Sequence, residues 1–328
     1  MKISIVGWYG MKNVGDEAFR CVLPEFFEGH EIEFITPPNK CNNPDIVILG
    51  GGAVTAPFYL DILPDCPRYG LGLSIAYESE IELLSKYNFK GIFCRNSTDI
   101  EQMRNKLDCP VDVMPDLAFL LQPNNSKIIE KYSNGKKKPI GVFVTDYVNP
   151  AIDRSVDDFG ARAWSFVQTM AKELDKLSKE FEIILVPCST GGYGDDRRIN
   201  LDLAAFMKSR PVNIMETLSP TEMIDLISGM HATICMRLHA HIFSIIAGTP
   251  LLSIGVTRKV KLLLEENGIT ALKSGEFCGD EFHIDDLSEK IEAMSFESDT
   301  AHYLKTAASN RSQLLNIMQR VRKEWLAQ

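Results

Sequence analysis

The chain has 328 residues, of which 45% are hydrophobic and 24% charged, a composition typical of a globular protein large enough for two domains. Its formal net charge of −9 argues against nucleic acid as a partner, because no basic run is longer than Lys136–Lys138. The first apolar run stops at Gly7, and no apolar stretch is long enough to span a bilayer, so we expect a cytoplasmic protein.

Short apolar runs alternate with helical patterns through the first part of the chain, where we expect strands at 2–6, 31–35, 45–49, 68–75, 91–94 and 111–114. The expected helices cover 16–28, 78–87 and 97–107, and Pro24 should kink or shorten the first of them. Alternating strands and helices favour parallel pairing. The pattern therefore predicts an α/β protein with a doubly wound, mostly parallel sheet.

A turn-rich, polar stretch at 122–139 interrupts this rhythm and predicts a boundary between an N-terminal domain at 1–130 and a C-terminal domain at 139–328. The pattern then restarts, with strands expected at 140–145, 182–187, 212–215, 232–236 and 250–256. Helices are expected at 157–179, 201–209, 239–247, 287–294 and 301–327. Another helix should begin after Ser219, because Ser-Pro-Thr-Glu at 219–222 combines a capping box with proline at the first helical position.

A glycine-rich loop follows the first expected strand and opens the first expected helix. Its free N–H groups would suit an anion or sugar hydroxyls, which makes Gly10, Asn13, Gly15 and Asp16 candidate binding residues. Asp16 could also cap the helix. The loop lacks the Gly-Lys-Ser/Thr ending of a P-loop and the spacing of a dinucleotide fingerprint. The competing interpretation is a plain tight turn between strand and helix.

Three consecutive glycines, which include Gly51 and Gly52, stand at the carboxyl end of the strand expected at 45–49. In open α/β sheets this end faces the ligand crevice, and glycine allows close approach of the backbone. A flexible turn is the alternative. Arg95 ends another expected strand of the same domain and should point into the same crevice.

Arg237 and His239 form the sharpest candidate, because they lie two residues apart at an expected strand-to-helix junction. Arginine can hold a carboxylate or phosphate through two hydrogen bonds, and histidine can transfer a proton near neutral pH. His241 lies inside the expected helix and is more readily explained as a packed core residue. Lys259 follows the next strand, where a cation opposes the helix dipole; a functional residue and a solvated surface lysine both fit.

Eight cysteines are scattered along the chain without a Cys-x-x-Cys pair. An isolated cysteine is most often a small buried hydrophobe, and a zinc site or a disulfide framework requires a different spacing. We therefore expect neither a metal nor a resident cofactor.

Taken together, these segments resemble the polysaccharide pyruvyl transferase family. The resemblance extends from residue 3 to about residue 268 and rests on motifs that occur in the family's order. These are the loop at 7–18, Asp-Ile-Val-Ile-Leu-Gly-Gly-Gly at 45–52, Arg-Asn-Ser at 95–97, Pro-Asp-Leu-Ala-Phe at 115–119, Met-Arg-Leu-His-Ala at 236–240, Ala-Gly-Thr-Pro at 247–250 and Lys-Val at 259–260. The stretches after Gly52 and at 189–198 depart from the family pattern.

The resemblance implies a GT-B-like fold of two Rossmann-like domains, with the last helix packing back on the N-terminal domain. It implies phosphoenolpyruvate as the donor and co-substrate, and a cyclic pyruvate ketal on a saccharide as the product. The acceptor could be lipid-linked, which would bring a cytoplasmic enzyme to the inner face of the membrane.

Residue roles also follow from the resemblance. Arg95, Arg237 and Lys259 would hold the donor carboxylate and phosphate. His239 would be the catalytic histidine beside Arg237. The glycine-rich positions and Asp116 would lie on the acceptor or phosphate side, and Asp16 and Asp116 are the candidate bases.

Two other functions fit the same sequence. The first is a GT-B glycosyltransferase that uses a nucleotide sugar, with which Ala-Gly-Thr-Pro at 247–250 is also compatible. The second is a non-catalytic saccharide-binding protein of the same fold. The presence of Arg237, His239 and Lys259 argues against loss of catalysis.

Overall fold

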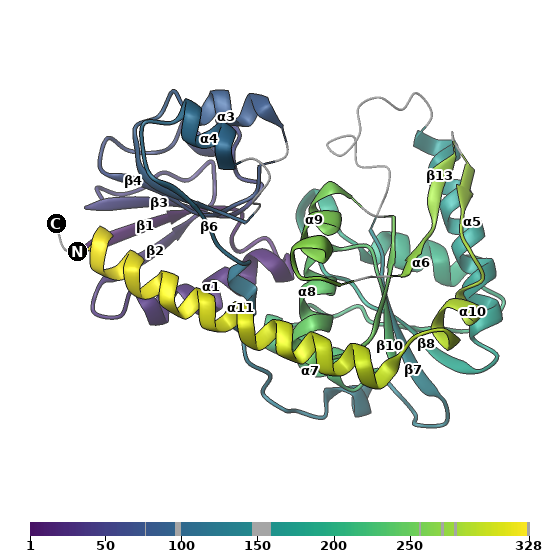
Figure 1. The fold of residues 1–328 in the computed structure, drawn as a ribbon. Coiled ribbons are helices and arrows are strands. Elements are labelled where there is room, and N and C mark those ends of the chain that lie inside the picture. The colour runs from purple at the N-terminus through teal and green to yellow at the C-terminus, as the bar shows by residue number, and fades with distance from the viewer. Residues whose placement is uncertain are drawn as a thin grey trace. The chain divides into compact units, whose positions relative to one another are not determined.

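The computed structural model describes residues 1–75, 77–95, 100–145, 159–255, 257–269, 272–278 and 281–326 (Figure 1). The chain forms two compact units. Unit 1 comprises Met1–Leu121 and Ala308–Gln328, and unit 2 comprises Gln122–Ala307.

The division between the units falls between residues 121 and 122, at the start of the stretch 122–139 where the sequence predicts a boundary. The reason is a buried carboxylate in unit 2. Asp225 accepts hydrogen bonds from the backbone N–H groups of Asn125 and Ser126, both at 3.0 Å, and from the Ser126 hydroxyl at 2.6 Å. These bonds fix the start of the polar stretch to unit 2.

Unit 1 contains six parallel strands in the order β2-β1-β3-β4-β5-β6. Their bounds are β1 Lys2–Val6, β2 Glu31–Ile35, β3 Ile46–Gly52, β4 Arg68–Leu73, β5 Phe89–Cys94 and β6 Val111–Val113. The helices are α1 Val14–Phe26, α2 Pro57–Leu60, α3 Glu78–Leu84 and α4 Ile100–Lys106, with the short 3-10 helix η1 Leu117–Leu120. Helices α3 and α4 lie on one face of this sheet and α1 on the other (Figure 1), as expected of a doubly wound sheet.

Unit 2 repeats this architecture with six parallel strands in the order β12-β11-β10-β7-β8-β9. Their bounds are β7 Lys138–Phe143, β8 Phe181–Leu185, β9 Val212–Asn213, β10 Ala232–Cys235, β11 Leu251–Ile254 and β12 Leu272–Ser274. A small antiparallel hairpin pairs β13 Glu276–Cys278 with β14 Glu281–His283.

The helices of unit 2 are α5 Phe159–Leu177, α6 Arg197–Phe206, α7 Pro220–Ser228, α8 Leu238–Ala247, α9 Arg258–Glu266 and α10 Leu287–Glu292, with 3-10 turns η2 Ile128–Lys131 and η3 Gly192–Gly194. Helix α5 illustrates how apolar residues at helical spacing predict a helix with one buried face. Its apolar stripe of Phe166, Met170, Leu174 and Leu177 is fully buried in the core of unit 2, because residues three and four apart share one face of a helix.

The last helix, α11 Phe296–Trp325, contributes residues to both units, with the change from unit 2 to unit 1 at Ala308. Within unit 1 its end is fixed by Trp325, which is 4% exposed and stacks on Tyr69 with ring centroids 4.2 Å apart. None of the helices in the described part of the chain is long and apolar enough to cross a membrane.

Several boundaries differ from the sequence expectations. Helix α1 begins at Val14 with Asn13 as its N-cap, so the suggestion that Asp16 caps it is wrong; Pro24 lies inside the helix, which continues to Phe26. Strand β3 continues through Gly52, so the glycines are the last residues of the strand. Helix α6 begins at Arg197, four residues earlier than expected. Residues 97–99, 146–158, 256 and 327, on which parts of three expected helices and one strand end fall, lie outside the described residues.

Candidate functional site

The glycine-rich loop after β1 is held against β3 by Tyr9. The Tyr9 hydroxyl donates a hydrogen bond of 2.7 Å to the backbone oxygen of Gly50, and the Tyr9 N–H donates to Thr36 Oγ1, also at 2.7 Å. Burial raises the pKa of Tyr9 well above its ordinary value, so the hydroxyl stays a donor. A Cβ on Gly7 would lie 2.6 Å from the Gly50 oxygen, which explains glycine there.

The candidate residues of this loop are partly occupied by bonds within the loop. The Gly10 N–H donates to Glu17 Oε1 at 2.6 Å, and the Gly15 N–H donates to Asn13 Oδ1 at 3.0 Å. The loop is therefore an ordered turn. Asp16 lies in the first turn of α1, beside the carboxyl end of β3.

Gly52 is the point where the candidate residues of unit 1 meet. Its φ of +82° favours glycine, and a Cβ at this position would lie 3.7 Å from Arg95 Nη2 and 3.9 Å from Asp16 Oδ1. Gly51 has a different role, since its Cβ would lie 2.9 Å from the Phe19 ring. The structure thus brings Gly52, Arg95 and Asp16 together, whereas Gly51 is explained by packing.

Arg95 forms an ion pair with Asp116, and the two side chains are only 8% and 3% exposed. Asp116 also accepts a hydrogen bond of 2.9 Å from the Ala118 N–H and so caps η1. A buried carboxylate paired in this way is poorly placed to act as a base, because losing its charge would leave the guanidinium uncompensated. Asp16, which is partly exposed, is the better candidate base in unit 1.

Arg237 and His239 stand at the carboxyl end of β10 in unit 2, as the sequence predicts. Arg237 is the N-cap residue of α8, and His239 is the second residue of that helix. The His239 ring lies 6.0 Å from the Phe243 ring between centroids, and its Nε2 atom is shielded from solvent.

His241 is fully buried, as expected of a core residue. Its Nδ1 lies 2.8 Å from the backbone oxygen of Arg237, and its Nε2 lies 2.8 Å from Ser253 Oγ. Because a carbonyl oxygen can only accept, Nδ1 carries the proton and Nε2 accepts from the Ser253 hydroxyl. Burial lowers the pKa of His241 to about 4, so the ring is neutral and anchors the backbone of Arg237.

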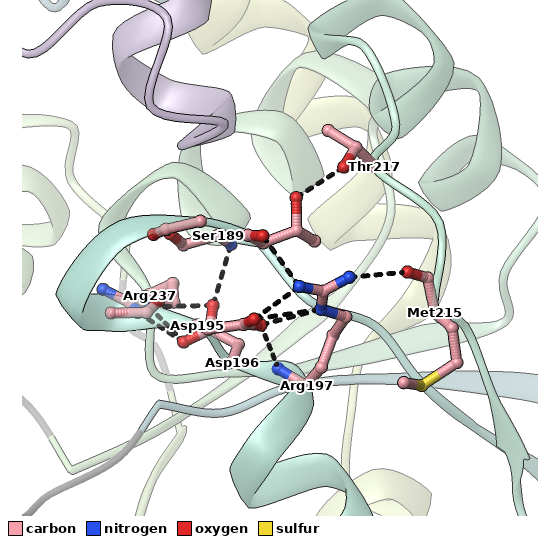
Figure 2. A network of polar contacts seen from close by, with 10 residues as sticks. Ser189, Asp195, Asp196, Arg197, Met215, Thr217 and Arg237 are labelled. Carbon is pink, nitrogen blue, oxygen red and sulfur yellow. Dashed lines mark hydrogen bonds and ion pairs between the residues drawn. The ribbon is translucent and has the colours of Figure 1, made fainter.

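The Arg237 side chain is held by a carboxylate, Asp196, that is not among the residues predicted from the sequence. Its Nε lies 3.1 Å from both carboxylate oxygens of Asp196, and its Nη2 contacts Asp196 Oδ1 and the Gly194 oxygen, the latter at 3.2 Å. Asp196 Oδ2 also accepts from the N–H groups of Cys188 and Ser189, both at 3.0 Å. Figure 2 shows Asp196 between Arg237 and Ser189.

A second pair stabilises the same loop, which connects β8 to α6. Arg197 Nε lies 2.9 Å and 3.1 Å from the two Asp195 carboxylate oxygens, and Arg197 Nη2 donates to the Thr190 oxygen at 2.9 Å. The Thr190 and Thr217 hydroxyls lie 2.6 Å apart (Figure 2). These contacts tie the loop to the segment after β9.

Lys259 lies in the first turn of α9, directly after β11. Strand β11 pairs with β10, so Lys259 follows the strand next to the one that carries Arg237 and His239. All three candidates of unit 2 therefore stand at the same edge of one sheet. Gly52, Arg95 and Asp16 stand at the corresponding edge of unit 1. That the two groups form one site remains a prediction.

In the described part of the chain, no group of three or more histidine, cysteine or acidic side chains is placed to hold a metal ion. The seven cysteines whose side chains are described are free thiols.

The model of the family described as polysaccharide pyruvyl transferase matches residues 13–258 of this chain, which includes the glycine-rich strand end, the Arg-Leu-His motif and the loop that carries Asp196. The chain belongs to the polysaccharide pyruvyl transferase family. Membership indicates a transferase that acts on polysaccharides. No curated protein matches the sequence.

Solved structures show the same fold at low sequence identity. MnaA of S. aureus, solved with UDP, has a TM-score of 0.62 at 11% identity, covering 99% of this chain and 97% of that one. A putative UDP-N-acetylglucosamine 2-epimerase from Listeria monocytogenes has a TM-score of 0.57 at 10% identity, covering 100% and 97%. Sucrose-phosphate synthase from Thermosynechococcus elongatus has a TM-score of 0.53 at 13% identity, covering both chains fully. The fold of this pyruvyl transferase family member is thus GT-B-like.

Proposed function

We propose that this protein transfers the pyruvyl group of phosphoenolpyruvate to a saccharide and forms a cyclic ketal. Family membership supports a polysaccharide transferase. The observation that carries the proposal is the placement of Arg237, His239 and Lys259 after two paired strands of one sheet. Two cations beside a histidine suit a substrate that carries both a carboxylate and a phosphate.

Donor binding is assigned to Arg237 and Lys259, with Arg95 contributing from unit 1. The protein has a net charge of −9, so a donor with both a carboxylate and a phosphate needs a local concentration of cations. Both arginines are paired with a buried carboxylate, but the Arg237 side chain is 23% exposed and the Arg95 side chain 8%, so we assign Arg237 the larger share of the donor's charge.

The chemistry assigns proton donation to His239. In the first step His239 protonates the methylene carbon of phosphoenolpyruvate, and a sugar hydroxyl adds to the neighbouring carbon and loses its proton. The bond from that carbon to the phosphate oxygen then breaks. A second hydroxyl closes the ketal, and its proton leaves with the phosphate. Of the two hydroxyl protons, one balances the proton gained by carbon and one is carried by inorganic phosphate.

Acceptor binding is assigned to the glycine-rich edge of unit 1, around Gly52 and Asp16. The missing side chain at Gly52 leaves the backbone beside a partly exposed carboxylate, and carboxylates accept hydrogen bonds from sugar hydroxyls. Asp16 is therefore our candidate base. We propose that the reaction requires no metal, and that it takes place in the cytoplasm or at the inner face of the membrane if the saccharide is lipid-linked.

The test is incubation of the purified protein with phosphoenolpyruvate and a panel of saccharides, analysed by mass spectrometry and by phosphate release. The expected result is a saccharide that gains the mass of a pyruvate ketal, with one phosphate released per ketal. The same experiment is repeated with a chelator, where activity should persist. Chelator-sensitive activity that a divalent cation restores would contradict the metal-free proposal.

A nucleotide-sugar glycosyltransferase is the competing function. Titration with uridine diphosphate and with phosphoenolpyruvate distinguishes the two. We expect binding of phosphoenolpyruvate. Tight binding of the nucleotide together with no binding of phosphoenolpyruvate would reject our proposal.

A further inference from the structure

We propose that Asp196 is a positioning residue that orients the Arg237 guanidinium for the donor, and that the pair acts as one unit at the edge of the unit 2 sheet. The inference rests on the proposed function for the identity of the donor, whereas the pairing itself can be tested without it. Neither the composition nor the motif around Arg237 reveals this residue, because Asp196 lies 41 positions earlier in the sequence.

Contacts along one edge hold the Arg237 guanidinium in place. Asp196 contacts the edge of Arg237 formed by Nε and Nη2, and the Gly194 oxygen accepts from Nη2 at 3.2 Å. A side-on contact of this kind fixes the plane of the guanidinium as well as its position. The Arg237 side chain is 23% exposed and the Asp196 side chain 1% exposed, so the cation reaches solvent whereas the carboxylate does not.

The position of the pair in the sheet gives it a role beyond folding. Strand β7 lies between β8 and β10, and the pair connects the loop after β8 to the residue after β10. It therefore spans the carboxyl end of β7, the edge where doubly wound sheets bind ligands. The Arg237 backbone is anchored separately by His241 at 2.8 Å. Both ends of the arginine are thus fixed before a ligand arrives, which lowers the entropy cost of binding.

The carboxylate itself is costly to bury. Burial raises the pKa of Asp196 above its ordinary value, and the charge of Arg237 opposes this effect. Two backbone N–H groups also bond Asp196, so the carboxylate is fully enclosed by donors. A well-packed apolar pair would fill this space at lower electrostatic cost. Retaining a charged pair here is consistent with a need for an oriented cation.

The neighbouring pair supplies a matched control. Asp195 binds Arg197 through the same type of contact, but Arg197 turns toward the Thr190 and Met215 oxygens and holds the loop (Figure 2). Asp195→Asn and Asp196→Asn therefore make the same chemical change at adjacent positions in one loop. Asp195→Asn removes the carboxylate that pairs with Arg197, whereas Asp196→Asn removes the one that pairs with Arg237.

The first experiment compares steady-state kinetics of the wild type, Asp196→Asn and Asp195→Asn in the full-length protein. We expect Asp196→Asn to lower kcat/KM for phosphoenolpyruvate on the order of 10²-fold, mostly through KM, because a displaced binding group loses the productive geometry. Asp195→Asn should change KM by less than about threefold while lowering Tm, the expected consequence of weakening a contact that only holds the loop. Combining Asp196→Asn with Arg237→Met should cost no more than Arg237→Met alone, because residues that act as a unit are not additive.

The second experiment needs no substrate and covers the case in which Asp196→Asn does not fold. The Nε–H group of Arg237 is observed by NMR in the wild type, assigned by its loss in Arg237→Lys. A carboxylate-bound Nε–H should exchange slowly with water and persist at high salt, since a desolvated pair is weakly screened. A rapidly exchanging signal would overturn the pairing.

The two experiments separate the inference from the proposed function. A slowly exchanging Nε–H together with no use of phosphoenolpyruvate by the wild type would reject the proposed function and the assignment of Asp196 to this donor, while leaving the pair itself intact. An unchanged KM in folded Asp196→Asn, or an equal rise in KM in Asp195→Asn, would overturn the positioning role.

Discussion

His239 is the side chain on which the proposed proton transfer depends, because it follows Arg237 at the carboxyl end of β10. His239→Gln keeps the size and some hydrogen bonding but cannot transfer a proton. We expect turnover at saturating phosphoenolpyruvate to fall by roughly 10²–10⁴, the usual contribution of general acid–base catalysis. Turnover, donor affinity and Tm are measured on the same variant.

His283 is the control for this substitution, since its side chain is 57% exposed and lies on the β14 strand. His283→Gln should leave turnover within about twofold, as surface substitutions generally do. If His239→Gln instead raises the KM or lowers Tm while turnover stays near normal, His239 binds or stabilises and does not transfer the proton.

A second prediction at the scale of single residues concerns His241 and the dependence of the unfolding free energy on pH. The folded-state pKa is lowered to about 4 from an ordinary 6.5, so the unfolded chain binds a proton between these values and the folded chain does not. Stability from this group is therefore fully present above about pH 6.5 and is lost as the pH falls toward 4. The shift corresponds to about 3 kcal/mol.

Denaturant unfolding at several pH values between 7 and 4 measures this loss, with pH points chosen around the shifted and ordinary pKa values. In His241→Gln the slope of unfolding free energy against pH should become shallower over this window, although the variant starts from a lower stability because Ser253 and the Arg237 oxygen lose their partner. Equal slopes in the wild type and the variant would show that His241 titrates normally.

At the scale of elements, Gly51 at the end of β3 and Gly29 in the turn between α1 and β2 are glycines for different reasons. Gly51 has a φ of +81° and no room for a Cβ beside Phe19, whereas Gly29 has a φ of +89° and nothing within 4 Å. Both alanine variants should lose about 1–2 kcal/mol to the left-handed backbone. Gly51→Ala should lose roughly 1–3 kcal/mol more through overpacking. Equal losses in chemical denaturation would rule out the contact with Phe19.

The capping box of α7 offers a second test at this scale. Ser219 Oγ accepts from the Glu222 N–H at 3.3 Å, and the Ser219 N–H donates to Glu222 Oε2 at 2.8 Å, as the sequence predicts. Ser219→Ala should lower the unfolding free energy by about 0.5–2 kcal/mol. Thr257 is the N-cap of α9 without a side-chain cap bond, so Thr257→Ala should cost much less. A similar cost for both would mean that the Ser219 cap contributes little.

The elements themselves show what the sequence could and could not predict. Strands with continuous apolar runs and the α5 stripe were predicted, since their periodicity is local. Residues next to strand ends, such as Arg237, could likewise be placed at the sheet edge. The partners of these residues could not, because Arg95 pairs with Asp116 and Arg237 with Asp196 through contacts between distant segments. The signal available for Asp196 was its place in a glycine-rich loop directly after an expected strand.

Across the whole molecule, the two compact units are not two consecutive segments of the chain, because unit 1 also includes the residues from Ala308 onward. The expected return of the last helix to the first domain followed from the resemblance to GT-B-like proteins and not from periodicity. Periodicity predicts that α11 is a helix but not which sheet it covers. The contact that decides this is the burial of Trp325 against Tyr69 and Phe93.

Trp325→Ala tests how much unit 1 depends on the end of the chain. Trp325 is 4% exposed, stacks on Tyr69 at 4.2 Å between centroids, and its ring lies 3.6 Å from the position of a Cβ on Gly91. Removing a buried tryptophan leaves a cavity over the sheet and should cost about 3–5 kcal/mol. Because the contacts are in unit 1, we expect its amides to lose hydrogen-exchange protection, with a smaller loss in the strands of unit 2.

Leu304 provides the matched control on the same helix. Its side chain is 48% exposed, and a Cβ on Gly248 of unit 2 would lie 2.8 Å from Leu304 Cγ. Leu304→Ala should cost less than about 1 kcal/mol, since little apolar surface is buried there. Hydrogen exchange is then measured for each strand in the wild type and in both variants. It shows whether the end of α11 stabilises unit 1 or contacts it without adding stability. Unchanged protection of β4 and β5 in Trp325→Ala would show that the sheet of unit 1 is stable without the last helix.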